Sequence, residues 1–450
     1  SMSTTIPPNL QATERKIRNQ LQTNPRDVMT QLRLARIFEF KRDFSAALIG
    51  YQEALRINNS CENCLIGLAS LLSHCKQKSD AIRLTEEFLD RSPGSVMATR
   101  QLALLNLEQK NYLEVIRIAQ KIQKLDRNLA TGYQVQAMAH LALGQEEEAV
   151  DYFKTALEND ESLAEVHLQL GMIYRKKPET VDFAARHLRK TLELGIVHPE
   201  IYKDLARMLL DKSRNKESIL EAIEELHKAL DMTSGYPEAY KLLSRAYKKL
   251  GNTTLAEIAT KHFEKLVRNY QNAGKSISRA ESHYENALKL LKEIKSDEAR
   301  DTLRKVIRLN PDMDSAYYML AMLDSMESRQ REAVNWVRKA IQINPVRPRY
   351  YLLLGENLPR TETADAIEAV NKAILLNPSE ASAYNIRGNI QFNDGQNESA
   401  VKSYRLAIRI DGENPVFHIN LSSVLQRLGD EEGSRRERNI YLRLSAIQDN

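Results

Sequence analysis

The stretch from Asp314 to Pro345, DSAYYMLAMLDSMESRQREAVNWVRKAIQINP, has the pattern of two short helices followed by a stop. In its first half, residues at three- and four-residue steps share one helix face; they are Tyr317, Leu320, Ala321 and Asp324. In its second half, a similar stripe consists of Ala333, Val337 and Ala340. Pro345 then ends the unit, because the ring of proline cannot continue a helix.

The small side chain of Ala321 indicates how the two helices pack. A small residue next to Leu320 allows a second helix to approach closely. Each helix of about 14 residues is only ~20 Å long, so one pair cannot bury its apolar faces alone. The stretch therefore predicts further pairs stacked beside it.

The same pattern recurs about 34 residues away in both directions. Toward the N-terminus, the equivalent positions are Ala287, Ala299, Val306 and Pro311. Toward the C-terminus, they are Gly355, Ala366, Ala373 and Pro378, and then Gly388, Ala400 and Ala407. In an earlier copy, Gly144 suits the turn between the two helices, since glycine takes a positive φ at a helix end.

A 34-residue period with a small residue in the first helix, alanine in the second and a closing proline resembles the tetratricopeptide repeat. The resemblance covers nearly the whole chain. It implies an all-α, right-handed superhelical solenoid of about twelve helix-turn-helix repeats with terminal capping helices. It also implies that the first helix of each repeat lines a concave groove.

The repeat pattern divides the chain into four predicted segments. They are an N-terminal tip with a capping helix at 1–27, a block of about seven repeats at 28–268, a linker or hinge at 269–279, and a block of about five repeats with a C-terminal cap at 280–450. The interval 269–279, NYQNAGKSISR, is polar and breaks the register. A surface insertion is the alternative to a hinge there.

Charge and hydropathy exclude two classes of function. The 65 basic and 60 acidic residues leave a formal charge of only +5, and no long basic run indicates nucleic-acid binding. No segment approaches the ~20 apolar residues that span a bilayer. The N-terminus lacks the charged start and apolar centre of a secretory signal. We expect a cytoplasmic protein, and a trimmed leader stays an open alternative.

No constellation of residues predicts catalysis, so we expect neither an enzyme nor a cofactor. The nine histidines are scattered, and no glycine-rich loop is suited to phosphate. Cys61-Glu62-Asn63-Cys64 is the one motif of metal-binding or redox type, but a structural zinc site needs four ligands and no second pair exists. We expect ordinary small residues at a repeat junction, with a metal or redox site as the alternative.

The groove side of the first helices predicts three zones of side chains. An apolar zone in repeats three to five contains Met97, Leu104, Leu107, Val135, Met138, Leu141 and Met172. A basic zone in repeats five to seven contains Arg175, Lys176, Lys203, Arg207, Lys241, Arg245, Lys248 and Lys249. A second apolar zone in repeats eight to ten contains Tyr284, Tyr318, Met319, Met322, Met326 and Leu352.

Such a groove suits a protein or peptide ligand with an acidic segment, because methionine adapts to helical or extended peptides and cations bind carboxylates. The alternative is that the apolar residues are inter-repeat core and the cations are solvated. We therefore predict a non-catalytic protein-protein interaction scaffold that helps assemble a larger complex. A regulatory or substrate-recruiting subunit of a separate enzyme is the alternative function, and self-assembly into a homo-oligomer is a third.

Overall fold

The computed structural model describes residues 10–212, 215–233 and 235–448, with the side chains of 10–12, 272–276 and 447–448 left out. Contacts divide the chain into two compact units, Ser1–Ile196 and Val197–Asn450. The described parts of both are helical and contain no strand. Of the predicted N-terminal segment, residues 1–9 lie outside the described ranges, and the helix predicted after them is α1 (Leu10–Thr23).

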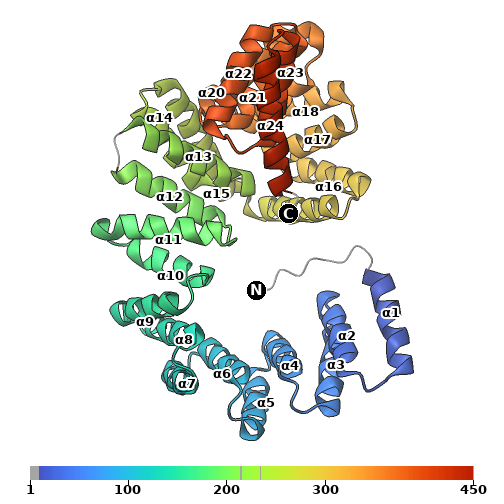
Figure 1. Ribbon diagram of the computed structural model, residues 1–450, viewed down its shortest axis with the longest axis vertical. Helices are drawn as coiled ribbons and strands as arrows, with labels where there is room; N and C mark the ends of the chain where they lie inside the picture. The colour runs from blue at the N-terminus through green and yellow to red at the C-terminus, as the bar shows by residue number, and fades with distance from the viewer. Residues whose placement is uncertain (1–9, 213–214, 234, 449–450) are drawn as a thin grey trace. The chain divides into compact units, whose positions relative to one another are not determined.

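In the first unit the helices follow one another in chain order, so each packs on its neighbours in sequence (Figure 1). After α1 come the pairs α2 (Val28–Phe40) and α3 (Phe44–Ile57), α4 (Glu62–His74) and α5 (Lys78–Arg91), α6 (Val96–Glu108) and α7 (Tyr112–Leu125), α8 (Ala130–Ala142) and α9 (Glu146–Asn159), and α10 (Ala164–Tyr174) and α11 (Val181–Glu193), with a 3-10 turn at Pro178–Thr180.

The second unit continues the same pairing with one long helix inside it. Its helices are α12 (Pro199–Lys212), α13 (Lys216–Met232), α14 (Pro237–Lys249), α15 (Thr253–Lys292), α16 (Ser296–Leu309), α17 (Asp314–Met326), α18 (Gln330–Ile343), α19 (Pro348–Asn357), α20 (Thr363–Leu376), α21 (Ala381–Asn393), α22 (Asn397–Ile410), α23 (Pro415–Arg427) and α24 (Glu431–Gln448), with a 3-10 turn at Arg360–Glu362. Counting α15 in two repeats, the described helices form the twelve pairs that the sequence predicts, and the predicted all-α solenoid is confirmed.

In many of the repeats, the turn between the two helices contains a residue with positive φ. In the first four repeats these residues are Arg42, Lys76, Lys110 and Gly144, with φ of 60°, 64°, 65° and 78°. They are 34 positions apart, so the period seen in the sequence is also the period of the backbone. Gly144 takes the positive φ predicted for it, which glycine adopts without a clash at Cβ.

Small residues let the two helices of a repeat touch. Ala321 of α17 is 0% exposed and packs with Val337 and Ala340 of α18, as predicted. Where glycine holds the same place, a Cβ has no room: at Gly171 it would lie 2.6 Å from Leu188. The hydrophobic core is therefore a strip that runs between paired helices and on to the next repeat.

The polar interval 269–279 is part of a continuous helix. It lies inside α15, which is 40 residues long and joins the second helix of repeat seven to the first helix of repeat eight. The interval is therefore no loop insertion. The contacts divide the chain between Ile196 and Val197. A hinge at 269–279 stays a prediction.

Within the second unit, repeats far apart in sequence meet in what we call the closing contact. Arg347, at the start of α19, donates from Nη1 to the carbonyl of Leu230 at 2.8 Å and from Nη2 to Asp231 Oδ1 at 2.6 Å, both near the end of α13. The Tyr247 hydroxyl of α14 donates to the carbonyl of Leu376 at 2.9 Å. The second unit is therefore fastened across more than one hundred residues of sequence.

A buried polar network completes the closing contact. The amide of Asn344 donates to the Tyr240 hydroxyl at 2.7 Å and to Asp314 at 2.6 Å, and Tyr350 donates to the same carboxylate at 2.8 Å. Burial lowers the pKa of His227 and of His262 to about 4, so both imidazoles are neutral at pH 7. The hydrogen bonds of Asn344, Tyr240, Tyr350 and Asp314 favour one arrangement of these repeats over alternatives.

Substituting Ala321→Leu should destabilise the second unit by about 1–3 kcal/mol, the usual effect of overpacking a tight helix contact. The chain's single tryptophan, Trp336, lies with its ring 6.0 Å from that of Tyr317 beside this contact, so its fluorescence reports urea unfolding there. The matched control is Met326→Ala on the same helix, because Met326 is exposed. An unchanged urea midpoint for Ala321→Leu would show that this position is not tightly packed.

Substituting Arg347→Leu should destabilise the second unit by about 2–4 kcal/mol, since it leaves the Leu230 carbonyl and the Asp231 carboxylate without this partner. Arg349→Leu is the control: Arg349 pairs with Asp231 at 2.9 Å but is more exposed than Arg347. We expect the urea midpoint, followed by Trp336 fluorescence, to fall further for Arg347→Leu. Equal midpoints would contradict a structural role for the closing contact.

Candidate groove surface

The groove surface consists of side chains on the first helix of each repeat that do not pack against the second helix. We describe it separately for the two units. In the first unit it belongs to α4, α6, α8 and α10, and in the second unit chiefly to α12, α14 and α17. The predicted residues divide into those that remain accessible there and those that the fold uses for its own contacts.

The apolar zone of the first unit is partly accessible. Met97 of α6 and Met172 of α10 are 46% and 40% exposed. Between them, Met138 and Leu141 of α8 are half-buried against the cluster around Phe153. The zone thus offers adaptable methionine side chains over a packed base, which suits an apolar peptide face.

One member of that predicted zone belongs to the core. Val135 is buried beside Leu102 and Ala139, on the face of α8 that packs against the preceding repeat. Its neighbours Leu104 and Leu107 are half-buried against the same cluster. The predicted phase is therefore wrong for Val135, whose side chain is not available to a ligand, and the groove role of the half-buried Met138 stays a prediction.

Lys203 of α12 is not a free groove cation. It is 8% exposed, its ammonium pairs with Glu200, and it lies 3.8 Å from Asp204 Oδ1. The ring centroid of Tyr236 is 5.8 Å from the ammonium, and the Tyr236 hydroxyl donates to Glu200. The Lys203 charge is therefore neutralised inside the fold, contrary to the expectation that it joins an open basic cluster.

Arg245 and Lys249 of α14 bind the end of α12. Arg245 Nη1 lies 2.5 Å from Asp211 Oδ1, and Arg245 Nη2 donates to the Leu210 carbonyl at 3.3 Å. Lys249 donates to the same carbonyl at 2.6 Å. Carbonyls in the last turn of a helix lack intrahelical donors and attract cations, so both side chains stabilise the junction of repeats six and seven.

The remaining predicted cations are more accessible. Arg207 lies 3.7 Å from Asp204 and is about half exposed, and Arg175 is exposed at the end of α10. Lys241 and Lys248 of α14 are exposed, and among the described residues neither has an acidic side chain within ion-pair distance. Lys241 and Lys248 are therefore the best candidates for a ligand's carboxylate in the second unit.

The second apolar zone is largely covered by the closing contact. Tyr318 is 9% exposed, with the ring of Tyr350 5.0 Å away and the guanidinium of Arg349 4.2 Å above it. Tyr284 packs against the core around Leu320, and burial raises the pKa of its hydroxyl. Met322 is half-buried beside them, so this predicted zone is mostly internal packing.

Sequence reasoning did not find the acidic partners that neutralise the basic zone. Glu200 lies three residues before Lys203, and Asp204 lies three residues before Arg207, a spacing at which helical side chains interact. That spacing was the available signal. Asp231 gave no signal, because its partners Arg347 and Arg349 are more than one hundred residues away.

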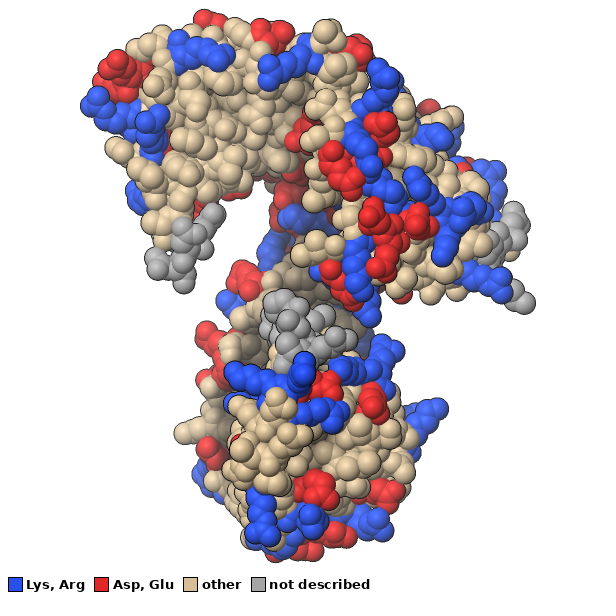
Figure 2. Space-filling model, turned by 90° about the vertical axis from the view of Figure 1, so that its right-hand side faces the viewer, with Lys and Arg blue, Asp and Glu red and all other residues tan. Residues whose placement is uncertain are grey.

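Charges on the surface are mixed. On the face shown in Figure 2, Lys and Arg side chains alternate with Asp and Glu, and no single basic patch dominates. Among the described residues no group of three or more His, Cys, Asp or Glu side chains is arranged to hold a metal ion. Nor does the described part of the chain contain a helix that is both long enough and apolar enough to cross a membrane.

The Cys61-Glu62-Asn63-Cys64 motif differs from the expectation of ordinary small residues. Its two cysteines are joined by a disulfide at the start of α4. Cys75, the third cysteine, is a free thiol at the end of the same helix. This pair is the chemically distinct feature of the first unit.

Comparison with known proteins identifies the repeat. Two family models, both described as tetratricopeptide repeat, match residues 130–163 and 360–415. TPR repeat-containing protein MJ1428 of Methanocaldococcus jannaschii is 25% identical over 222 residues, which are 48% of this chain and 38% of that protein. The chain thus spans less than half the length of this relative.

Several solved structures align with this chain at low sequence identity and low TM-score. The Cut9-Hcn1 hetero-tetramer of APC/C matches at a TM-score of 0.37 and 15% identity over 94% of this chain and 89% of that one. A MamA RS-1 ArsTM double mutant matches at a TM-score of 0.35 and 19% identity, over 38% of this chain and 97% of that one. Naa15/Naa10 bound to HypK-THB matches at a TM-score of 0.31 and 16% identity, over 98% of this chain and 74% of that one. The chain therefore contains tetratricopeptide repeats at residues 130–163 and 360–415, one stretch in each unit, in agreement with its 34-residue helix pairs.

Proposed function

We propose that the chain is a non-catalytic scaffold that binds a protein partner on its groove surface and helps assemble a larger complex. The observation that carries this proposal is the pair of exposed lysines on α14, Lys241 and Lys248. The other cations of the same helix face, Arg245 and Lys249, are used to hold α12. Two cations left over on a face otherwise committed to packing are available to an acidic ligand.

The apolar zone of the first unit supports the same function. Met97 and Met172 are 46% and 40% exposed on first helices, and Met138 and Leu141 of the first helix between them are half-buried. Exposing methionine to water costs free energy that a peptide's apolar face would recover. The proposed partner therefore has an apolar segment for the first unit and an acidic segment for the second.

The compartment and the wider role belong to this proposal as well. We propose a cytoplasmic location. If the captured partner is a catalytic chain, the role becomes that of a regulatory or substrate-recruiting subunit. If it is a second copy of this chain, light scattering at increasing concentration will show a rise in mass.

The test begins with affinity capture of a partner and measures its binding to the wild type and to Lys241→Glu/Lys248→Glu. We expect at least about tenfold weaker binding, because two favourable charge contacts become repulsive. The matched control is Arg435→Glu/Arg436→Glu on α24, which changes the net charge by the same amount on exposed side chains of a second helix.

Salt dependence gives an independent reading of the same contact. Wild-type affinity should fall as salt is added, because exposed charges are screened within about 10 Å at 0.1 M. The Lys241→Glu/Lys248→Glu variant should keep its helicity, since neither lysine is buried. If that variant binds the partner as the wild type does while the α24 control does not, the groove assignment is wrong.

A further inference from the structure

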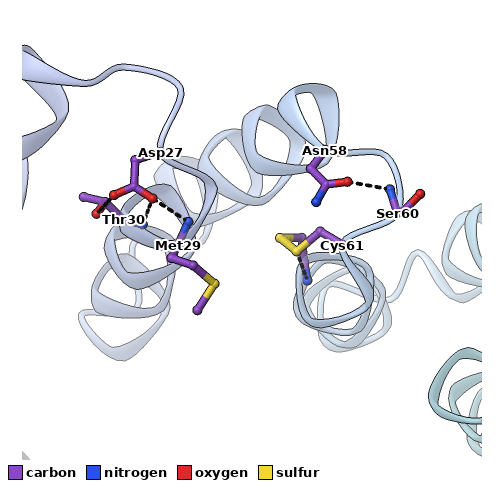
Figure 3. The surroundings of a disulfide bond; sticks show 7 residues. Asp27, Met29, Thr30, Asn58, Ser60 and Cys61 are labelled. Carbon is purple, nitrogen blue, oxygen red and sulfur yellow. Dashed lines mark hydrogen bonds between the residues drawn. A yellow bond between two sulfur atoms is a disulfide. The ribbon is translucent and has the colours of Figure 1, made fainter.

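The disulfide of the first unit lies at the N-terminus of a helix. Cys61 is the N-cap of α4, and Cys64 is the third residue of that helix (Figure 3). The backbone N–H of Cys64 donates to Cys61 Sγ at 3.3 Å. The sulfur of Cys61 therefore occupies the place where an N-cap side chain accepts from the first turn.

The two sulfurs differ in access. Cys64 is 0% exposed and belongs to the core formed with Leu32, Ala35 and Tyr51. Cys61 is partly exposed at the edge of that core. An external thiol can therefore reach Cys61 from solvent, whereas Cys64 is shielded.

The disulfide contributes little to the stability of the fold. Its cysteines are three positions apart, so it closes a very short loop and removes little entropy from the unfolded chain. Both cysteines already belong to a capped helix of 13 residues that is packed in the repeat core. Structural need alone does not account for two cysteines at this place.

We propose that Cys61 and Cys64 form a redox-active pair that exchanges with external dithiols and disulfides, with Cys61 as the sulfur that reacts. A helix N-terminus stabilises a thiolate through its backbone N–H groups and its dipole, and thiolates are the nucleophiles in such exchange. In a reducing compartment, disulfides are commonly of this reactive kind. The inference goes beyond the proposed scaffold function and does not depend on partner binding.

The exchange balances without another reactant. A thiolate of an external dithiol attacks Cys61 Sγ, the bond between the two cysteine sulfurs breaks, and Cys64 leaves as a thiolate that takes up a proton. The second thiol of the external dithiol loses its proton and attacks the dithiol sulfur that is bonded to Cys61. This closes the dithiol's disulfide and releases Cys61 as a thiolate. The external dithiol is thereby oxidised to a disulfide, and the protein pair is reduced by two electrons. The reverse sequence re-oxidises the pair.

The same helix provides an internal control. Cys75 is the C-cap of α4 and, like Cys61, is partly exposed. At that end the backbone presents carbonyl oxygens instead of the N–H donors found at the start of the helix. The carboxylate of Glu62, next to Cys61, repels a negative charge on the Cys61 sulfur and so acts against the helix N-terminus. The difference in reaction rate between Cys61 and Cys75 therefore measures the net effect of their positions in the helix.

The first experiment uses Cys64→Ala, which leaves Cys61 and Cys75 as free thiols in one molecule. Iodoacetamide is added near pH 7, and peptide mass spectrometry follows the labelling of each cysteine. We expect Cys61 to react about tenfold faster than Cys75, because thiolate content sets the rate. In Cys64→Ala, oxidised glutathione should form a mixed disulfide with Cys61. In Cys61→Ala, it should form no mixed disulfide with the buried Cys64.

The second experiment needs no substitution and guards against a variant that fails to fold. Wild-type protein is reduced with dithiothreitol, which is then removed. One portion is labelled briefly with iodoacetamide, and a second portion is treated with oxidised glutathione before labelling. We expect Cys61 to be labelled before Cys64, and the pair to re-form its disulfide. If Cys61 reacts no faster than Cys75, or if the disulfide does not re-form, the proposal is overturned.

Discussion

The structure depends on the close approach of two helices within each repeat, at a place where only a small side chain fits. At Gly355 and Gly388 a Cβ would lie 2.7 Å from Val370 and 2.5 Å from Tyr404, and Ala321 is wholly buried at the same contact. Because each pair buries its apolar stripe this way, it needs neighbours to cover the rest, and the chain extends as a stack. We propose that the other side of the first helices binds the protein partner.

The long helix α15 and the closing contact alter this scheme in the second unit. Arg347 and Asn344 connect repeats nine and ten to α13 and α14, and the same contact brings Arg349 over Tyr318. Side chains that would line a groove in a regular array therefore become core. The accessible surface that remains is the methionine zone of the first unit and the lysines of α14, each described within its own unit.

Local patterns predicted much of the fold and less of the surface. The 34-residue spacing around Ala321 located the helix pairs, because small residues and helix periodicity leave a signal in neighbouring residues. A loop insertion at 269–279 was one alternative that the sequence left open, and the structure has a continuous helix there, since polar residues without proline also continue a helix. Lys203 was misread because Tyr236, which lies over its ammonium, is in another repeat. The role of the disulfide could not be predicted from the sequence, because only the fold shows that Cys61 is the N-cap of α4 and that Cys64 is buried.

The central claim is that a protein partner binds the first helices of the repeats. Hydrogen–deuterium exchange of the chain, free and saturated with its captured partner, tests it most directly. The account predicts slower exchange in α6, α8, α10 and α14, whose exposed side chains form the groove surface, with little change in α7, α9 and α11. Protection confined to α7, α9 and α11 would contradict it, because those second helices form the opposite side of the repeats.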